Sequence, residues 1–113
     1  GNTTFDWVTL ESSIQWAAFQ RLVKLLRARG NDVLVVVGPF NEHMMTAASR
    51  ESYRRLRDGV VMGVQAEGVA IVVPEVLPSA LYADASHPLT DGYHAMAHRI
   101  SADAGFQAWA KPR

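Results

Sequence analysis

The most informative stretch for the architecture reads Asp32-Val33-Leu34-Val35-Val36-Val37-Gly38-Pro39, a nearly unbroken apolar run. Val and Leu that do not alternate with polar residues are typical of a strand buried on both faces, as in parallel sheets covered by helices. A second run, Val69-Ala70-Ile71-Val72-Val73, is stopped by Pro74. The two runs predict two buried strands.

Helical periodicity surrounds both runs. Apolar side chains recur every three or four residues and predict helices over the ranges 11–29, 49–67 and 90–104. Ser12 or Ser13 can cap the first helix, and Gly30 suits its end. The range 3–10 predicts a short strand or an extended arm, and Phe106 and Trp109 are expected to fold the C-terminal tail back onto the body.

Helix, strand, helix, strand and helix with short connections form the pattern of parallel crossovers. We therefore expect one α/β domain over residues 1–113, with part of a three-layer α/β/α sandwich around a parallel sheet. Two or three strands make a thin sheet, so its open edge should be covered by absent N-terminal chain, a partner or a second copy. The start at Gly1-Asn2, without Met, is expected to be either a scar of cloning or a cut end, and in the second case upstream sequence is missing.

Composition narrows the function classes. Eleven basic and eleven acidic residues cancel, so no overall field attracts nucleic acid or an anionic membrane surface. No apolar run approaches the roughly 20 residues that span a bilayer. The chain has no Cys, so its redox compartment cannot be inferred and its localisation stays open.

One short motif carries chemistry. Asp84 stands three residues before His87, which Pro88 follows. A carboxylate at this spacing can reach Nδ1 of the imidazole, fix its tautomer and leave Nε2 free to accept a proton. The motif predicts a general base with its orienting carboxylate.

Asp84-x-x-His87-Pro88, followed by Gly92-Tyr93 and an Ala-rich helix, resembles the last conserved block of the SGNH (GDSL-like) esterases and acyltransferases. The resemblance implies a flavodoxin-like sheet and a triad in which His87 is the base and Asp84 its partner. It also implies that the nucleophilic Ser, in a Gly-Asp-Ser motif, and the oxyanion donors lie upstream. The implied substrate is an acyl ester of a carbohydrate, a lipid or another small molecule.

The resemblance extends over the range 11–100, which is similar to the C-terminal half of such a domain. Within the superfamily, a strand that closes on Pro39 with Asn41 two positions later is similar to the branch of the teichoic-acid D-alanyl transfer protein and the alginate acetyltransferase-like proteins. No Ser of this chain stands in a Gly-Asp-Ser or Gly-x-Ser-x-Gly turn. Ser12 and Ser13 precede a helix without the glycine that a nucleophile turn needs.

The isolated chain is therefore expected to be inactive, with its nucleophile outside these residues. The alternative is a non-catalytic α/β domain, a pseudoenzyme that binds a partner or oligomerises through the open sheet edge. A small flavodoxin-like or receiver-like domain is disfavoured, because the chain has too few strands and no acidic cluster after the first.

Other polar residues suggest weaker sites. Asn41, Glu42 and His43 follow the first strand, at the sheet edge where ligands bind in open α/β folds, and they either contact substrate or cap the next helix. His94 and His98 are an i, i+4 pair but lack the Glu of HExxH. We expect no metal and no cofactor.

Overall fold

The computed structural model describes residues 1–112, a mixed α/β structure with four α-helices and a two-stranded parallel sheet in that range. The helices are α1 (Ile14–Ala28), α2 (Ala47–Ala66), α3 (Thr90–Ala102) and α4 (Ala104–Ala110), and the strands are β1 (Leu34–Val36) and β2 (Ala70–Val72). Three 3₁₀ turns, η1 (Leu10–Ser12), η2 (Glu42–Met44) and η3 (Ser79–Leu81), complete the order of elements in the described residues.

The two strands pair in parallel, with Leu34 opposite Ala70 and Val36 opposite Val72. Both are shorter than the apolar runs that predicted them. The expected burial on both faces is wrong for part of β1, because Val35 is buried whereas Val36 is 40% exposed. Within the described residues β1 has a neighbouring strand on one side only, so its other edge lies open.

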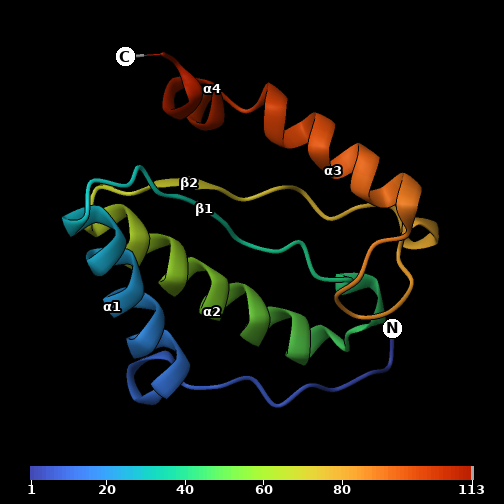
Figure 1. Cartoon of the computed structure of the whole chain (residues 1–113). Helices are drawn as coiled ribbons and strands as arrows, with labels where there is room; N and C mark the ends of the chain where they lie inside the picture. The colour runs from blue at the N-terminus through green and yellow to red at the C-terminus, as the bar shows by residue number, and fades with distance from the viewer. Residues whose placement is uncertain (113) are drawn as a thin grey trace.

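Helices lie on either side of the strands (Figure 1), α1 and α2 on one side and α3 and α4 on the other. Both strands run toward the same end of the molecule. There β1 continues into η2, and the loop of residues 82–88 lies beside it. Because the carboxyl ends of the strands and this loop meet, the topology gathers the candidate residues at one end of the sheet.

The core between the sheet and the first two helices contains Val23, Val35, Val64 and Val69, with Trp16 packed against them. Burying each Val contributes roughly 1.5–3 kcal/mol. Gly63 of α2 allows this packing, because a Cβ there would lie 2.7 Å from Cζ2 of Trp16. The glycine thus brings α2 close to α1.

Helix α1 is shorter than the predicted range 11–29, because residues 10–12 form η1, but one of its two predicted caps and its terminal glycine are confirmed. The Ser13 hydroxyl accepts a hydrogen bond from the backbone N–H of Trp16 at 3.1 Å, and Gly30 follows the helix with φ of +85°. Its apolar surface is only partly covered, however. Ile14 is 79% exposed, and Leu22 and Leu25 are about half exposed.

The ends of the chain pack on the body. The arm before η1 is extended rather than a strand, and it is held where Phe5 N–H and the Trp7 indole N–H donate to the Ser49 hydroxyl at 3.1 and 3.2 Å. The tail expected to fold back forms α4. The carboxylate of Asp103 caps this helix by accepting from Phe106 N–H at 3.0 Å, and α4 packs against β2.

Candidate functional site

Asp84 and His87 form a hydrogen-bonded pair. Nδ1 of His87 lies 2.9 Å from Oδ1 and 3.0 Å from Oδ2 of Asp84. Oδ1 also accepts from the backbone N–H groups of Ser86, at 2.9 Å, and of His87, at 2.8 Å. An Asp that accepts from the N–H two residues ahead forms an Asx turn. The pair is therefore built by a local turn that the sequence itself encodes.

These contacts decide the charge of the carboxyl group. The backbone hydrogen bond from Ser86, followed by the side-chain and backbone bonds from His87, holds the pKa of Asp84 below its usual value. A carboxylate can only accept, so Nδ1 of His87 must be the donor. Neutral His87 then has its proton on Nδ1 and its lone pair on Nε2. This is the tautomer that a general base requires.

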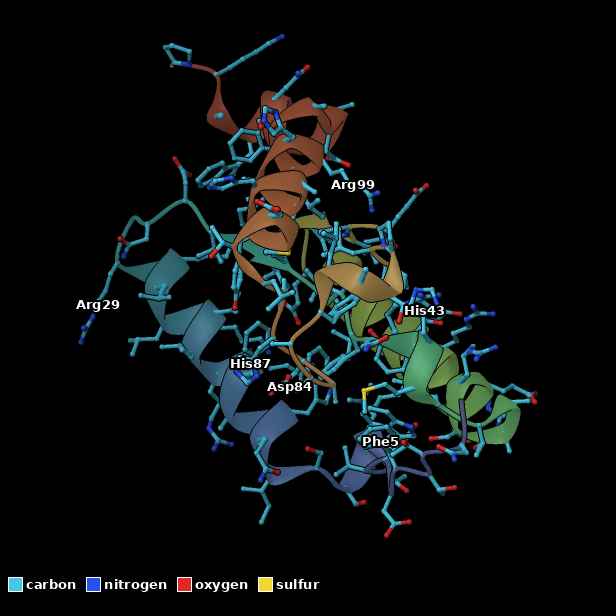
Figure 2. All side chains as sticks on the ribbon, turned by 90° about the vertical axis from the view of Figure 1, so that its right-hand side faces the viewer. Phe5, Arg29, His43, Asp84, His87 and Arg99 are labelled. Carbon is cyan, nitrogen blue, oxygen red and sulfur yellow. The ribbon has the colours of Figure 1, made fainter. Side chains whose placement is uncertain are left out.

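The pair lies at the surface. The side chains of Asp84 and His87 are 58% and 67% exposed. Figure 2, which views the molecule from the end where this loop lies in Figure 1, shows both side chains below the strands. No atom of the described residues makes a hydrogen bond with Nε2 of His87. The proton-accepting atom is thus open to a substrate or to another polypeptide segment.

No serine in the range 1–112 is placed as a nucleophile for this base. The Ser86 hydroxyl lies 3.2 Å from Nδ1 of His87, the nitrogen that faces the carboxylate. Ser13 caps α1, and the Ser12 hydroxyl donates to the Thr9 carbonyl at 3.3 Å.

Backbone pairing closes the loop that carries the pair. Ala83 N–H donates to the His87 carbonyl at 2.7 Å. At the start of the loop, the Tyr82 hydroxyl accepts from Leu77 N–H at 3.1 Å and donates to the Phe40 carbonyl at 3.3 Å. Burial raises the pKa of the Tyr82 hydroxyl, so it keeps its proton for this bond. Tyr82 therefore joins the loop to the end of β1.

Asn41 joins the same loop to the sheet. Its backbone N–H donates to the Ala85 carbonyl at 2.9 Å, and its side-chain Nδ2 lies 3.5 Å from the carbonyl oxygen of Asp84. Only 6% of Asn41 is exposed. Asn41 follows β1 at the edge of the sheet, and the structure places it against the loop that carries Asp84 and His87.

Glu42 is buried next to Asn41, with 5% of its surface exposed. Its Oε1 accepts from Nε of Arg54 at 2.8 Å, and its Oε2 lies 3.8 Å from Arg57. Arg50 donates to the Glu42 carbonyl at 3.2 Å. Three arginines of α2 thus hold η2 in place through this one residue.

His43 is exposed beside a small polar pocket of about 210 Å³, which Arg50 and Arg54 also line. Its Nε2 lies 2.8 Å from the carbonyl oxygen of Leu77. The three residues expected to contact substrate therefore occupy different settings: Asn41 against the Asp84 loop, Glu42 among arginines, and His43 at the surface. Substrate contact stays a prediction for all three.

Gly92 fits α3 against the loop. A Cβ at this position would lie 2.5 Å from the carbonyl oxygen of Leu81 and 2.9 Å from Cβ of Pro88. Both positions are well inside van der Waals contact, so the helix can approach the loop this closely only with glycine. The Gly of the Gly92-Tyr93 pair therefore has a packing function directly after the His87 loop.

An apolar groove of about 460 Å³ follows the open edge of β1. No charged side chain lines it, and its walls include Val8, Leu10, Trp16, Phe19, Val36 and Leu56. Residues of α1, β1 and α2 line the groove along the unpaired edge of β1. Phe19, which lines the groove, is itself 37% exposed.

His94 and His98 line a shallow surface pocket with Ala97 and Ser101. Among residues 1–112 no three His, Cys, Asp or Glu side chains gather where they could hold a metal ion. In the same range no helix is both long and apolar enough to cross a membrane.

Comparison with models of known protein families, with curated proteins and with solved structures finds no match for this chain.

Sequence reasoning missed two features of the site. One is the Asx turn, whose signal is the Asp84-x-Ser86 spacing. The other is the support of Glu42 by arginines, for which Arg50, Arg54 and Arg57 at helical spacing were the available signal. A solvated helix face is the usual interpretation of such arginines, and only the tertiary packing of η2 distinguishes the two.

Proposed function

We propose that this chain supplies the base and the orienting carboxylate of an SGNH-type ester hydrolase or O-acyltransferase, whose nucleophilic Ser lies outside residues 1–113. The observation that carries the proposal is the bond from Nδ1 of His87 to the Asp84 carboxylate, which leaves Nε2 free. A solvent-facing imidazole with this tautomer can accept a proton from a hydroxyl nucleophile.

In the proposed reaction the Ser oxygen attacks the acyl carbonyl while Nε2 of His87 takes the hydroxyl proton. The Asp84 carboxylate stabilises the imidazolium that forms. When the ester C–O bond breaks, His87 returns the proton to the departing alcohol. Water or an acceptor hydroxyl then attacks the acyl-enzyme with the same help from His87, which regenerates the Ser. The substrate class is an acyl ester of a carbohydrate, a lipid or another small molecule.

The proposal also includes the fold of the complete domain. We propose that the chain is the C-terminal half of a three-layer α/β/α domain with a flavodoxin-like parallel sheet. The open edge of β1 and the uncharged groove beside it support this assignment. A further strand from the absent N-terminal portion would pair with β1 and cover the exposed apolar face of α1. A parallel strand would also end at the edge of the sheet where Asp84 and His87 lie.

The test is a His87→Ala substitution in a polypeptide that includes the upstream region. Loss of the base is expected to lower acyl-ester turnover by about 10³-fold or more. His98→Ala is the matched control, because His98 is also exposed but lies on α3 away from the pair, and it should leave turnover unchanged. Full turnover in His87→Ala would remove His87 from the mechanism.

Fluorophosphonate labelling followed by intact mass spectrometry locates the nucleophile. The proposal expects an adduct on the upstream segment and none on the isolated chain 1–113. An adduct on this chain would instead point to Ser12 or Ser13. With no adduct on the longer polypeptide either, the non-catalytic alternative would gain, since the open edge of β1 and its groove equally fit a binding or oligomerisation domain.

A further inference from the structure

The loop that carries Asp84 and His87 has few ties to the rest of the chain. Its own bonds are local, linking Asp84 to the backbone of Ser86 and His87 and Ala83 to His87. Within residues 1–112, the hydrogen bonds that leave the range 83–88 all end on Asn41. The position of the exposed pair therefore depends on Asn41, on the bond from the Tyr82 hydroxyl to the Phe40 carbonyl at the start of the loop, and on the packing of the loop.

Asn41 is itself fixed. It lies directly after Phe40, whose carbonyl accepts from Tyr82, and its own carbonyl accepts from Met44 N–H at 3.2 Å in η2. Glu42, the next residue, is buried and bound by arginines. A residue held in this way, which donates to two successive carbonyls of the loop, can fix the position of the loop relative to the sheet.

The side chain of Asn41 is oriented by its neighbour. The carbonyl oxygen of Asp84 can only accept, so the amide nitrogen must face it. This orientation leaves Oδ1 of Asn41 enclosed without a hydrogen-bond partner among the described residues. An enclosed acceptor without a partner lowers stability. An apolar side chain of the same size would avoid this cost, so stability alone does not account for Asn at this position.

We propose that Asn41 is a positioning residue for the Asp84–His87 pair. Its backbone N–H holds the Ala85 carbonyl and its side-chain amide holds the Asp84 carbonyl, so that the turn keeps the Asp84 carboxylate within hydrogen-bond distance of Nδ1 of His87. This inference rests on the proposed function only for what the Asp84–His87 pair does. The contacts of Asn41 with the loop do not depend on any reaction. It goes beyond the expectation that Asn41 contacts substrate.

The test is NMR of the isotope-labelled chain carrying Asn41→Leu, a change of similar size that removes the amide and the enclosed acceptor together. Unfolding free energy from urea titration is expected to stay the same or rise. The amide exchange of His87, whose N–H is bound to Asp84, should quicken about three- to ten-fold, as expected for losing one hydrogen bond. The fraction of His87 imidazole protonated at Nδ1 in its neutral form, read from the ring nitrogen shifts, should fall.

Asn31→Leu is the matched control, because the Asn31 amide also donates to a backbone carbonyl, that of Leu26 at 2.9 Å, at the far end of α1. It should leave the exchange and the tautomer of His87 unchanged. The proposal would be overturned if the amide exchange and the tautomer of His87 in Asn41→Leu were the same as in the wild-type chain. It would also be overturned if Asn41→Leu lowered the free energy of unfolding and left both properties of His87 unchanged.

A second measurement covers the case in which Asn41→Leu does not fold. In the wild-type chain the Asn41 N–H should be protected from exchange, because it donates to Ala85. Exchange at the rate of a free amide would overturn the proposal. None of these readouts involves acyl transfer, so a failure of the proposed enzyme activity and a failure of this inference are distinguishable.

Discussion

The Nδ1 atom of His87 lies 2.9 Å from Oδ1 of Asp84, a residue only three positions earlier in the chain. The same carboxylate oxygen accepts two backbone N–H groups of the turn. One short loop thus contains the imidazole, the carboxylate that fixes its tautomer and the N–H donors that keep this carboxylate charged. A pair built this locally does not require the rest of a sheet to form, which is why it is complete in a chain whose sheet has an open edge.

Asp84→Asn should separate the geometry of the pair from its charge. The amide can keep the turn by accepting from Ser86 N–H, but it no longer requires His87 to hold its proton on Nδ1. In the polypeptide with the upstream region, acyl-ester turnover is expected to fall about 10⁴-fold. Asp58→Asn, at an exposed carboxylate of α2, is the control and should leave turnover within about two-fold. Equal turnover in the two variants would show that Asp84 does not orient a base.

The pH dependence of stability follows from the pKa of Asp84, which is lower in the folded chain than its ordinary value. A group of this kind stabilises the fold above its unfolded pKa, about 3.9, and the contribution is lost as pH falls through the lower folded pKa. The ¹³C shift of the Asp84 carboxyl should therefore titrate at lower pH in the native chain than in urea. A native midpoint at or above the unfolded midpoint would contradict the turn described here.

Much of the fold is predictable because its signals are local. The periodicity of α1, the glycine at Gly30 and the two apolar runs place the helix, its end and the parallel strands. The Asp84-x-x-His87 spacing likewise predicts the bonded pair, because a tight turn brings the carboxylate within reach of an imidazole three residues later.

What the sequence could not give depends on tertiary context. Ile14 and Leu22 follow the apolar period of α1 yet are exposed, because periodicity marks which residues can be buried and not whether a surface lies opposite them. The break between α3 and α4 at Asp103 was missed for a related reason. The Asp103 side chain caps a second helix, α4. This helix packs on β2, a tertiary contact that the local sequence does not reveal.

Glu42→Gln should lower stability, because a buried carboxylate bound by Arg54 and Arg57 would be replaced by a neutral amide. We expect a loss of about 1–3 kcal/mol in the free energy of unfolding, measured by urea titration. Glu51→Gln is the matched control: its partner Arg55 lies one helical turn away and both side chains are exposed, so the loss should stay below about 0.5 kcal/mol. Repeating both titrations in 1 M salt should abolish only the smaller effect. Equal losses in the two variants would mean that burial does not strengthen the Glu42 contacts.

Gly92→Ala tests how closely α3 must approach the loop of the pair. In a helix, Gly to Ala normally gains up to about 1 kcal/mol. At Gly92 the new methyl would lie 2.5 Å from the Leu81 carbonyl oxygen, well inside the roughly 3.3 Å at which carbon and oxygen come into contact. Since the obstacle is backbone, α3 or η3 must move, and we expect a net loss of about 1–3 kcal/mol in unfolding free energy. Gly59→Ala is the control, because its methyl would meet only the end of the Leu10 side chain, at 3.1 Å, and it should be neutral or stabilising. A stabilised Gly92→Ala chain would show that α3 can move away from Leu81 without cost, and the distance between α3 and the His87 loop would then not be set by this glycine.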